Sequence, residues 1–247
     1  MYVEKDYVKT FIPPVDMAGG FEAKHHFGNN CDREITIHFP LYNNVKDLYI
    51  GIQKGSLFKE HSPYRHSSKI VYYGSSITQG GCVSRPGLAY TSQVSLKIDC
   101  DFVNLGFSGS AKGESAMAKY IATLKPDIFV MDYDHNAPTL AFLENTHEAF
   151  FHAFREIQKH TPVVLLSAPN VGFGGENWKK RRDTVYRTYQ NAVMSGDRNV
   201  YFIDGAQLWG EDDWRECSVD GTHPNDIGHY RMAQKLIPVI QKIIKKS

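Results

Sequence analysis

The order of hydrophobic and polar residues divides the chain into two parts with different periods. In the first part the apolar stretches are short and alternate with polar residues, as in Glu34–Phe39 and Leu48–Ile52. A period of two is typical of half-buried β-strands, and the pair Asn43-Asn44 between these stretches is a turn signal. The pattern therefore predicts a small antiparallel β region over residues 1–68.

In the second part, strand-like apolar runs alternate regularly with helical patterns. The expected strands are Lys69–Tyr73, Asp101–Leu105, Asp127–Tyr133, Pro162–Leu166 and Asn199–Ile203. The expected helices are Tyr90–Ile98, Glu114–Leu124, Leu140–His160, Tyr186–Met194 and Asp226–Ile244. This alternation is the signature of a parallel sheet covered by helices on both faces. We therefore expect an α/β domain with a five-stranded parallel sheet over residues 69–247.

Charge and hydropathy narrow the classes of partner. The chain has 28 basic and 27 acidic side chains and a formal net charge of +1, so no broad field attracts nucleic acid or an anionic membrane surface. No stretch approaches the roughly 20 apolar residues of a membrane span, and the charged amino-terminal residues contain no signal-peptide core. We predict a cytoplasmic protein with no nucleic-acid partner and no membrane partner.

The cysteines and histidines show no metal-binding pattern. Cys31, Cys82, Cys100 and Cys217 are scattered and lack Cys-x-x-Cys spacing, so we expect free thiols rather than a zinc site or a redox pair. His147 falls on the apolar stripe of the third expected helix, which predicts a core or boundary residue rather than a ligand.

Four polar, turn-forming stretches have the residue types that catalysis needs. The first three follow predicted strands directly, and the fourth precedes the last helix. They are Gly74–Thr78 (Gly-Ser-Ser-Ile-Thr), Asn104–Ser110 (Asn-Leu-Gly-Phe-Ser-Gly-Ser), Asp132–Asn136 (Asp-Tyr-Asp-His-Asn) and Ser218–Asn225 (Ser-Val-Asp-Gly-Thr-His-Pro-Asn). In open α/β sheets, ligands bind outside the carboxyl ends of the strands, where such loops meet.

A serine nucleophile requires partners that this chain can supply. A serine hydroxyl reacts poorly near neutral pH unless a base lies within hydrogen-bond reach and a third group fixes the tautomer of that base. Asp220 and His223 are three residues apart around a glycine-containing turn, so the carboxylate can accept from Nδ1 and leave Nε2 facing the serine. On this evidence alone Ser75 and Ser76 are equal candidates, and the Asp-x-x-His pair could equally be loop residues before a capped helix.

The four stretches together resemble the sequence blocks of the GDSL, or SGNH, hydrolases. Gly-Ser-Ser-Ile-Thr resembles the first block, Phe107-Ser-Gly109 the second, Asn136 the asparagine of the third, and Asp220-Gly-Thr-His223-Pro the last. Their order and spacing also match, over residues 69–245. The resemblance implies a three-layer α/β/α sandwich of flavodoxin type around a parallel sheet of about five strands, in agreement with the strand count above.

The resemblance also implies a role for each matching residue. Ser76 would be the nucleophile, His223 the general base, and Asp220 the residue that orients the imidazole. The amides of Ser76 and Gly109 and the side chain of Asn136 would form the oxyanion hole, and neither a cofactor nor a metal would be needed.

Two departures from the family pattern add expectations of their own. Ser75 stands where the family usually has an aspartate, and Asp134 and His135 stand where it commonly has a glycine. Asp134 or His135 could contact substrate, with surface exposure or helix capping as the alternative. The segment Tyr42–Gly51 resembles the β-rich region before the catalytic domain in one branch, which includes carbohydrate esterases. Because it is short for a complete β-sandwich, an incomplete sheet or a homo-oligomer is expected.

The function implied by the resemblance is that of a serine esterase that forms an acyl-enzyme at Ser76. The expected substrate is a small-molecule or carbohydrate ester with a short acyl group such as acetyl. Trp178, Trp209 and Trp214 could stack on sugar faces, or they could be packing residues. The alternatives are a lipid-directed acylhydrolase, an acyltransferase, and a glycan-binding module with a vestigial triad. The chemically competent residues in all four stretches argue against the binding module.

Overall fold

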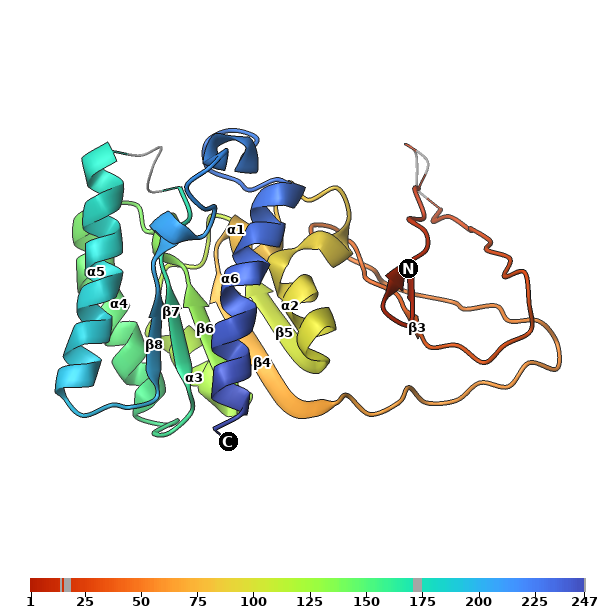
Figure 1. Ribbon diagram of the computed structural model, residues 1–247, viewed down its shortest axis with the longest axis horizontal. Coiled ribbons are helices and arrows are strands. Elements are labelled where there is room, and N and C mark those ends of the chain that lie inside the picture. The colour runs from red at the N-terminus through yellow and green to blue at the C-terminus, as the bar shows by residue number, and fades with distance from the viewer. Residues whose placement is uncertain (14, 16–18, 171–174, 247) are drawn as a thin grey trace. The chain divides into compact units, whose positions relative to one another are not determined.

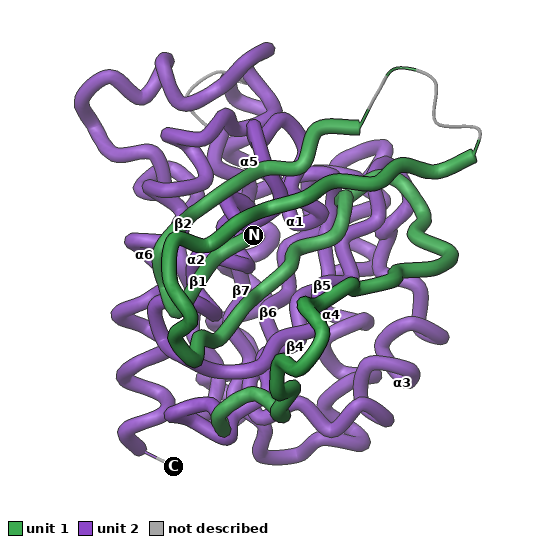
Figure 2. Tube along the Cα trace, turned by 90° about the vertical axis from the view of Figure 1, so that its right-hand side faces the viewer, with its two compact units in different colours: residues 1–63 green, residues 64–247 purple. Residues whose placement is uncertain are grey.

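The chain forms two compact units, Met1–Pro63 and Tyr64–Ser247, which Figure 2 shows in different colours. They are seen in a computed structural model that describes every residue except 14, 16–18, 171–174 and 247. Among the described residues, no helix is long and apolar enough to cross a membrane. The domain division at residues 1–68 and 69–247 stays a prediction.

The larger unit is built on a five-stranded parallel sheet with the strand order β5-β4-β6-β7-β8. Its strands are β4 (His66–Gly74), β5 (Cys100–Gly106), β6 (Ile128–Asp132), β7 (Val163–Leu166) and β8 (Val200–Ile203). The helices are α1 (Ser76–Gln79), α2 (Tyr90–Ile98), α3 (Ser115–Thr123), α4 (Leu140–Arg155), α5 (Gly175–Met194) and α6 (Asp226–Ile244). The predicted α/β fold and its five parallel strands are therefore confirmed.

Two hydrophobic cores lie on opposite faces of this sheet and give the three layers visible in Figure 1. Successive side chains of a strand point to opposite faces. In β4, Ile70 and Tyr72 belong to the core shared with α2 and α6, and Val71 and Tyr73 belong to the core shared with α3, α4 and α5. All four cysteines are free thiols, as predicted, and two of them are buried.

Helix α5 is longer than its sequence pattern predicts. It begins at Gly175, whereas the apolar period indicates a start at Tyr186. The added turns contain consecutive basic residues, Lys179 to Arg182, which carry no apolar stripe. A hydrophobic period indicates a helix only where one face is buried, so it does not show the mostly solvated first turns of α5.

The smaller unit has less β-structure than expected. An antiparallel sheet with the order β2-β1-β3 joins β1 (Tyr2–Val3), β2 (Asp6–Tyr7) and β3 (Ile35–Thr36). The predicted strand at Leu48–Ile52 is wrong, because the structure has no strand there. Its side chains are exposed, Tyr49 to 90%, and an alternating pattern forms a strand only when another strand pairs with it.

Candidate active site

The turn after β4 places Ser76 at the edge of the sheet. Ser76 is the first residue of α1, and the Oγ of Ser75 caps that helix by accepting from the amide of Ile77 at 3.1 Å. A Cβ at Gly74 would lie 2.0 Å from Oγ1 of Thr78, so only glycine fits between the strand and the helix. The chain therefore reverses sharply and presents the Ser76 hydroxyl at the carboxyl ends of the strands.

Ser76, His223 and Asp220 form a continuous chain of hydrogen bonds. Ser76 Oγ lies 2.9 Å from His223 Nε2, and His223 Nδ1 lies 2.7 Å from Asp220 Oδ2. Partial burial opposes ionisation of Asp220, but hydrogen bonds from the His223 side chain and from the amides of His223 and Thr222 outweigh it and lower the pKa of Asp220 to about 2. An ionised Asp220 keeps the proton on Nδ1, which leaves Nε2 free to accept from Ser76.

The turn that carries Asp220 and His223 is fixed by hydrogen bonds to two other parts of the fold. Asn225 caps α6 through its Oδ1, which accepts from the amides of Ile227 and Gly228. On the sheet side, Asn170 Nδ2 donates to the carbonyl of Gly221 at 3.2 Å. The turn is therefore anchored to α6 and to the loop after β7.

Two of the predicted oxyanion donors, Gly109 and Asn136, come from loops that contact each other. Asn136 Nδ2 donates to the carbonyl of Phe107 at 2.9 Å, and the amide of Phe107 donates to the carbonyl of Gly74 at 2.8 Å. Gly109 has a positive φ of 68°, and its amide has no acceptor within the described part of the chain. Both loops thus lie beside the strand that leads to Ser76. Among the residues that the structure describes, one amide hydrogen of Asn136 has no acceptor.

Asp134 is buried in the loop before Asn136 instead of being presented on the surface. It is 1% exposed, and its Oδ2 accepts from the amide of Ala168 at 3.0 Å. Burial raises the pKa of Asp134 to about 6, although hydrogen bonding to Ala168 and the charge of Arg181 oppose the rise. Arg181 also donates to the carbonyls of Asp134 and Ala137. These contacts fix the shape of the loop that carries Asn136.

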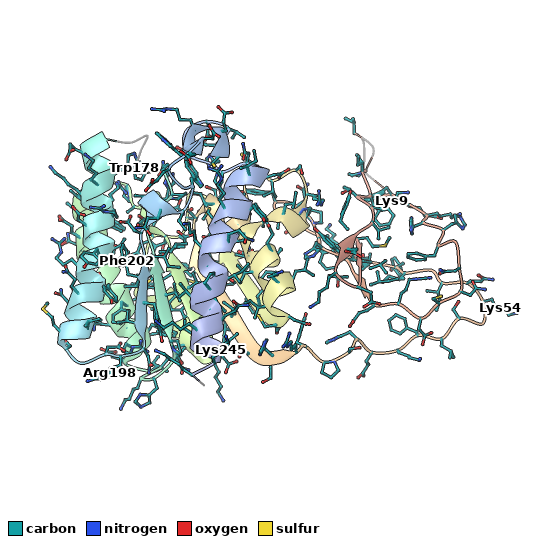
Figure 3. The ribbon with its side chains drawn as sticks, in the orientation of Figure 1. Lys9, Lys54, Trp178, Arg198, Phe202 and Lys245 are labelled. Carbon is teal, nitrogen blue, oxygen red and sulfur yellow. The ribbon has the colours of Figure 1, made fainter. Side chains whose placement is uncertain are left out.

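His135 lies next to the predicted general base. Its ring stacks on Trp178 at 4.9 Å between centroids, and its edge faces the ring of His223 at 6.5 Å. Burial, together with the neighbouring His223 and Arg181, lowers the pKa of His135 to about 4, so the imidazole is neutral near neutral pH. Figure 3 shows Trp178 near the amino-terminal end of α5.

The three tryptophans offer little free surface for a sugar. Trp209 is fully buried in the core, and Trp178 packs against His135. The guanidinium carbon of Arg215 lies 4.5 Å from the centre of the Trp214 ring. His147 is also a core residue, as predicted, with Nδ1 2.8 Å from the hydroxyl oxygen of Thr188.

A buried polar network behind Ser76 was not predicted. Asp132 Oδ2 accepts from the hydroxyls of Thr78 and Tyr90 at 2.8 and 2.9 Å. Burial and the neighbouring Asp134 raise the pKa of Asp132 well above its usual range. The sequence signal for this network was Asp132, a carboxylate at the end of an otherwise apolar strand. The sequence does not show which hydroxyls donate to it.

One known protein family matches most of this chain. The model of the GDSL-like lipase/acylhydrolase family matches residues 67–241. The chain belongs to this family. No curated protein matches it.

Solved structures of similar proteins share the fold. A GDSL-like lipase from Bacteroides ovatus is 35% identical with a TM-score of 0.67, over 76% of this chain and 56% of that one. The salicylyl-acyltransferase SsfX3 of a tetracycline biosynthetic pathway is 21% identical with a TM-score of 0.62, over 76% and 57%. The two-domain esterase CEX, active on acetylated mannans, is 23% identical with a TM-score of 0.53, over 72% and 50%. The match thus spans 50–57% of the length of these three proteins.

Proposed function

We propose that this protein is a serine esterase in which Ser76 is the nucleophile, His223 the general base and Asp220 its orienting group. The observation that carries the proposal is the unbroken hydrogen-bond chain from Ser76 Oγ through the His223 ring to Asp220. The 2.9 Å between Ser76 Oγ and His223 Nε2 is within the range at which a proton can pass from nucleophile to base. The family supports the reaction class, since its members are lipases and acylhydrolases.

The geometry leads to a two-step reaction. Ser76 Oγ attacks the ester carbonyl while its proton passes to His223 Nε2, and the carbonyl oxygen becomes an oxyanion. We assign the stabilisation of this oxyanion to the amides of Ser76 and Gly109 and to the Asn136 side chain, each such donor contributing about 10²- to 10³-fold in kcat. The protonated His223 then gives its proton to the departing alkoxide. In the second step, water attacks the acyl-enzyme in the same way, with His223 as the base. The acid is released and Ser76 is restored.

The proposed substrate is a short acyl ester, such as acetyl, on a carbohydrate. The fold is shared with CEX, described as active on acetylated mannans, and with a Clostridium thermocellum carbohydrate esterase solved with cellohexaose at 18% identity. The leaving oxygen must take its proton from His223 Nε2, and the ring of His135 lies 6.5 Å from the ring of His223 between centroids. We therefore propose His135 as a contact of the alcohol. Asp134, being buried, acts on substrate through the loop that it supports.

Hydrolysis of nitrophenyl esters of increasing acyl length tests this proposal. We expect rapid hydrolysis of the acetate and a fall of at least about tenfold in kcat/KM for chains several carbons longer. Acid quench during the steady state should show one acetyl group on the peptide that contains Ser76, detected by mass spectrometry, because the reaction passes through an acyl-enzyme.

Other outcomes identify the alternatives. A rate that increases with chain length would favour a lipid-directed acylhydrolase over a deacetylase. Transfer of the acetyl group to an added sugar alcohol in preference to water would indicate an acyltransferase. No hydrolysis and no acetylated peptide, with a folded protein, would leave only a binding module.

The pH profile gives a second prediction. We expect kcat/KM to rise with pH and then level off, since the proposed general base acts only in its neutral form. The carboxyl of Asp220, with its pKa lowered to about 2, stays ionised across this range. Asp134, with its pKa raised to about 6, also titrates in the mildly acidic range. The variant Asp134→Asn separates the two groups: it should keep the acidic limb, and loss of that limb would assign it to Asp134.

A further inference from the structure

His229, in the second turn of α6, bridges two segments that flank the nucleophile. It is fully buried. Its Nε2 lies 3.2 Å from the carbonyl oxygen of Gly81, and its Nδ1 accepts from the amide of Tyr90 at 3.3 Å. Since Nδ1 accepts, the ring proton must be on Nε2, where it is donated to Gly81. Both ring nitrogens are therefore used, in one defined tautomer.

The contact with Tyr90 completes the start of α2. The first amides of a helix lack partners within the helix and are usually satisfied by the residue before it. Here that residue is Ala89, which has no side chain to accept a hydrogen bond. His229 supplies the acceptor from another helix and packs parallel to the Tyr90 ring at 6.1 Å. Burial lowers the pKa of His229 to about 4, which keeps the ring neutral and able to accept.

The contact with Gly81 reaches the nucleophile itself. The amide of Gly81 donates to the carbonyl of Ser76 at 2.8 Å, while the carbonyl of Gly81 accepts from His229. Gly81 thus links the backbone of Ser76 to α6. A second link lies nearby, because Asp226 Oδ1 accepts from the amide of Ser84 at 2.8 Å.

These links matter because His223 lies only three residues before the first residue of α6. The bond between His223 and Asp220 is formed within one turn, so it does not depend on how α6 packs. The distance from Ser76 to His223, in contrast, joins residues 147 positions apart and is set by the seating of α6 against the loop after α1. We propose that His229 is a positioning residue that holds the nucleophile and the general base at reactive distance through Gly81. For its kinetic readout this inference rests on the proposed function.

Two substitutions of His229 separate its two hydrogen bonds. The short amide of His229→Asn can replace Nδ1 but cannot reach Gly81, whereas the longer amide of His229→Gln can place its NH₂ near the position of Nε2. We expect His229→Asn to lower kcat by about 10- to 100-fold with KM nearly unchanged, since small misplacements of reacting groups cost this much. His229→Gln should restore most of kcat. The rate at which a fluorophosphonate labels Ser76 should follow kcat.

The matched control is His147→Gln, at another buried, neutral histidine on the opposite face of the sheet. Thermal midpoints are measured for all variants, and rates are compared below the lowest midpoint. Equal losses of kcat in His229→Asn and His229→Gln, or a loss no larger than in His147→Gln, would overturn the positioning role. If His229→Asn does not fold, Asp226→Ala breaks the second link. It should lower kcat without raising KM, and an unchanged kcat would refute the argument from α6 seating.

Failure of the proposed function gives a different result. If Ser76→Ala keeps full turnover, the esterase assignment at Ser76 fails whatever the His229 variants do. If Ser76→Ala is inactive and the His229 variants retain the wild-type kcat and labelling rate, only the positioning role fails.

Discussion

Replacement of Ser76 by alanine is expected to lower kcat for nitrophenyl acetate by about 10⁶-fold, the size of effect that follows loss of a triad nucleophile. The variant removes Ser76 Oγ, the proposed attacking atom, which lies 2.9 Å from His223 Nε2. Folding should be preserved, because alanine is compatible with the first turn of α1. Initial rates at saturating ester, with circular dichroism as the check on folding, measure the effect.

Ser75→Ala is the matched control for this variant. It removes a hydroxyl from the neighbouring residue, whose Oγ caps α1 by accepting from the amide of Ile77. The loss of an N-cap costs about 1 kcal/mol of stability, so we expect a lower thermal midpoint and a kcat within about tenfold of the wild type. A Ser75→Ala variant as inactive as Ser76→Ala, with Ser76→Ala still accepting an acetyl group, would reverse the assignment of the nucleophile.

Replacement of Asp220 by asparagine is expected to lower kcat by about 10⁴-fold, as in other triads in which the acid becomes an amide. The amides of Thr222 and His223 donate to Oδ1, at 2.8 and 2.7 Å, and will hold the oxygen of the new side chain in that position. Its NH₂ group then faces His223 Nδ1, which must accept. The ring proton moves to Nε2 and points at Ser76, so the base is blocked.

The control for Asp220→Asn removes the same charge from another part of the chain. Asp212 is exposed, and Asp212→Asn should leave kcat unchanged. Steady-state kinetics of both variants, at a pH where wild-type activity has levelled off, give the comparison. A loss below about tenfold in Asp220→Asn would mean that Asp220 does not set the tautomer, and the proposed triad would fail.

The triad could be proposed from sequence because its residues lie in short stretches that resemble the blocks of a known family, whereas the local pattern alone left Ser75 and Ser76 as equal candidates. Asp220 and His223 are close in the chain, and the polar stretch at Ser76 follows a recognisable strand. His229 could not be predicted in this way. In the sequence it is one more residue on an amphipathic helix, and its partners Gly81 and Tyr90 are far away in the chain. Such a role depends on how α6 packs against α2, which periodicity does not specify.

Burial and strand pairing were the other limits of prediction. Asp134 is a charged residue in a polar loop, so its sequence context favoured exposure, yet it is 1% exposed. The segment Leu48–Ile52 has the alternation of a strand but no strand partner. In both cases the outcome depends on neighbours that are distant in sequence. The parallel strands of the larger unit were easier to predict, because a strand buried on both faces appears in the sequence as a continuous apolar run.

The turn from Ser218 to Asn225 has a consequence for recombination between relatives. It contains both the proposed acid and the proposed base, its ends are joined by the bridge between Ser218 and Pro224, and Asn225 caps the helix that follows. A chimaera that exchanges this one segment would import an intact Asp220–His223 pair with its hydrogen bond. We therefore expect these eight consecutive residues to be transferable as one segment, with only their fit to a serine on the recipient's sheet left to select.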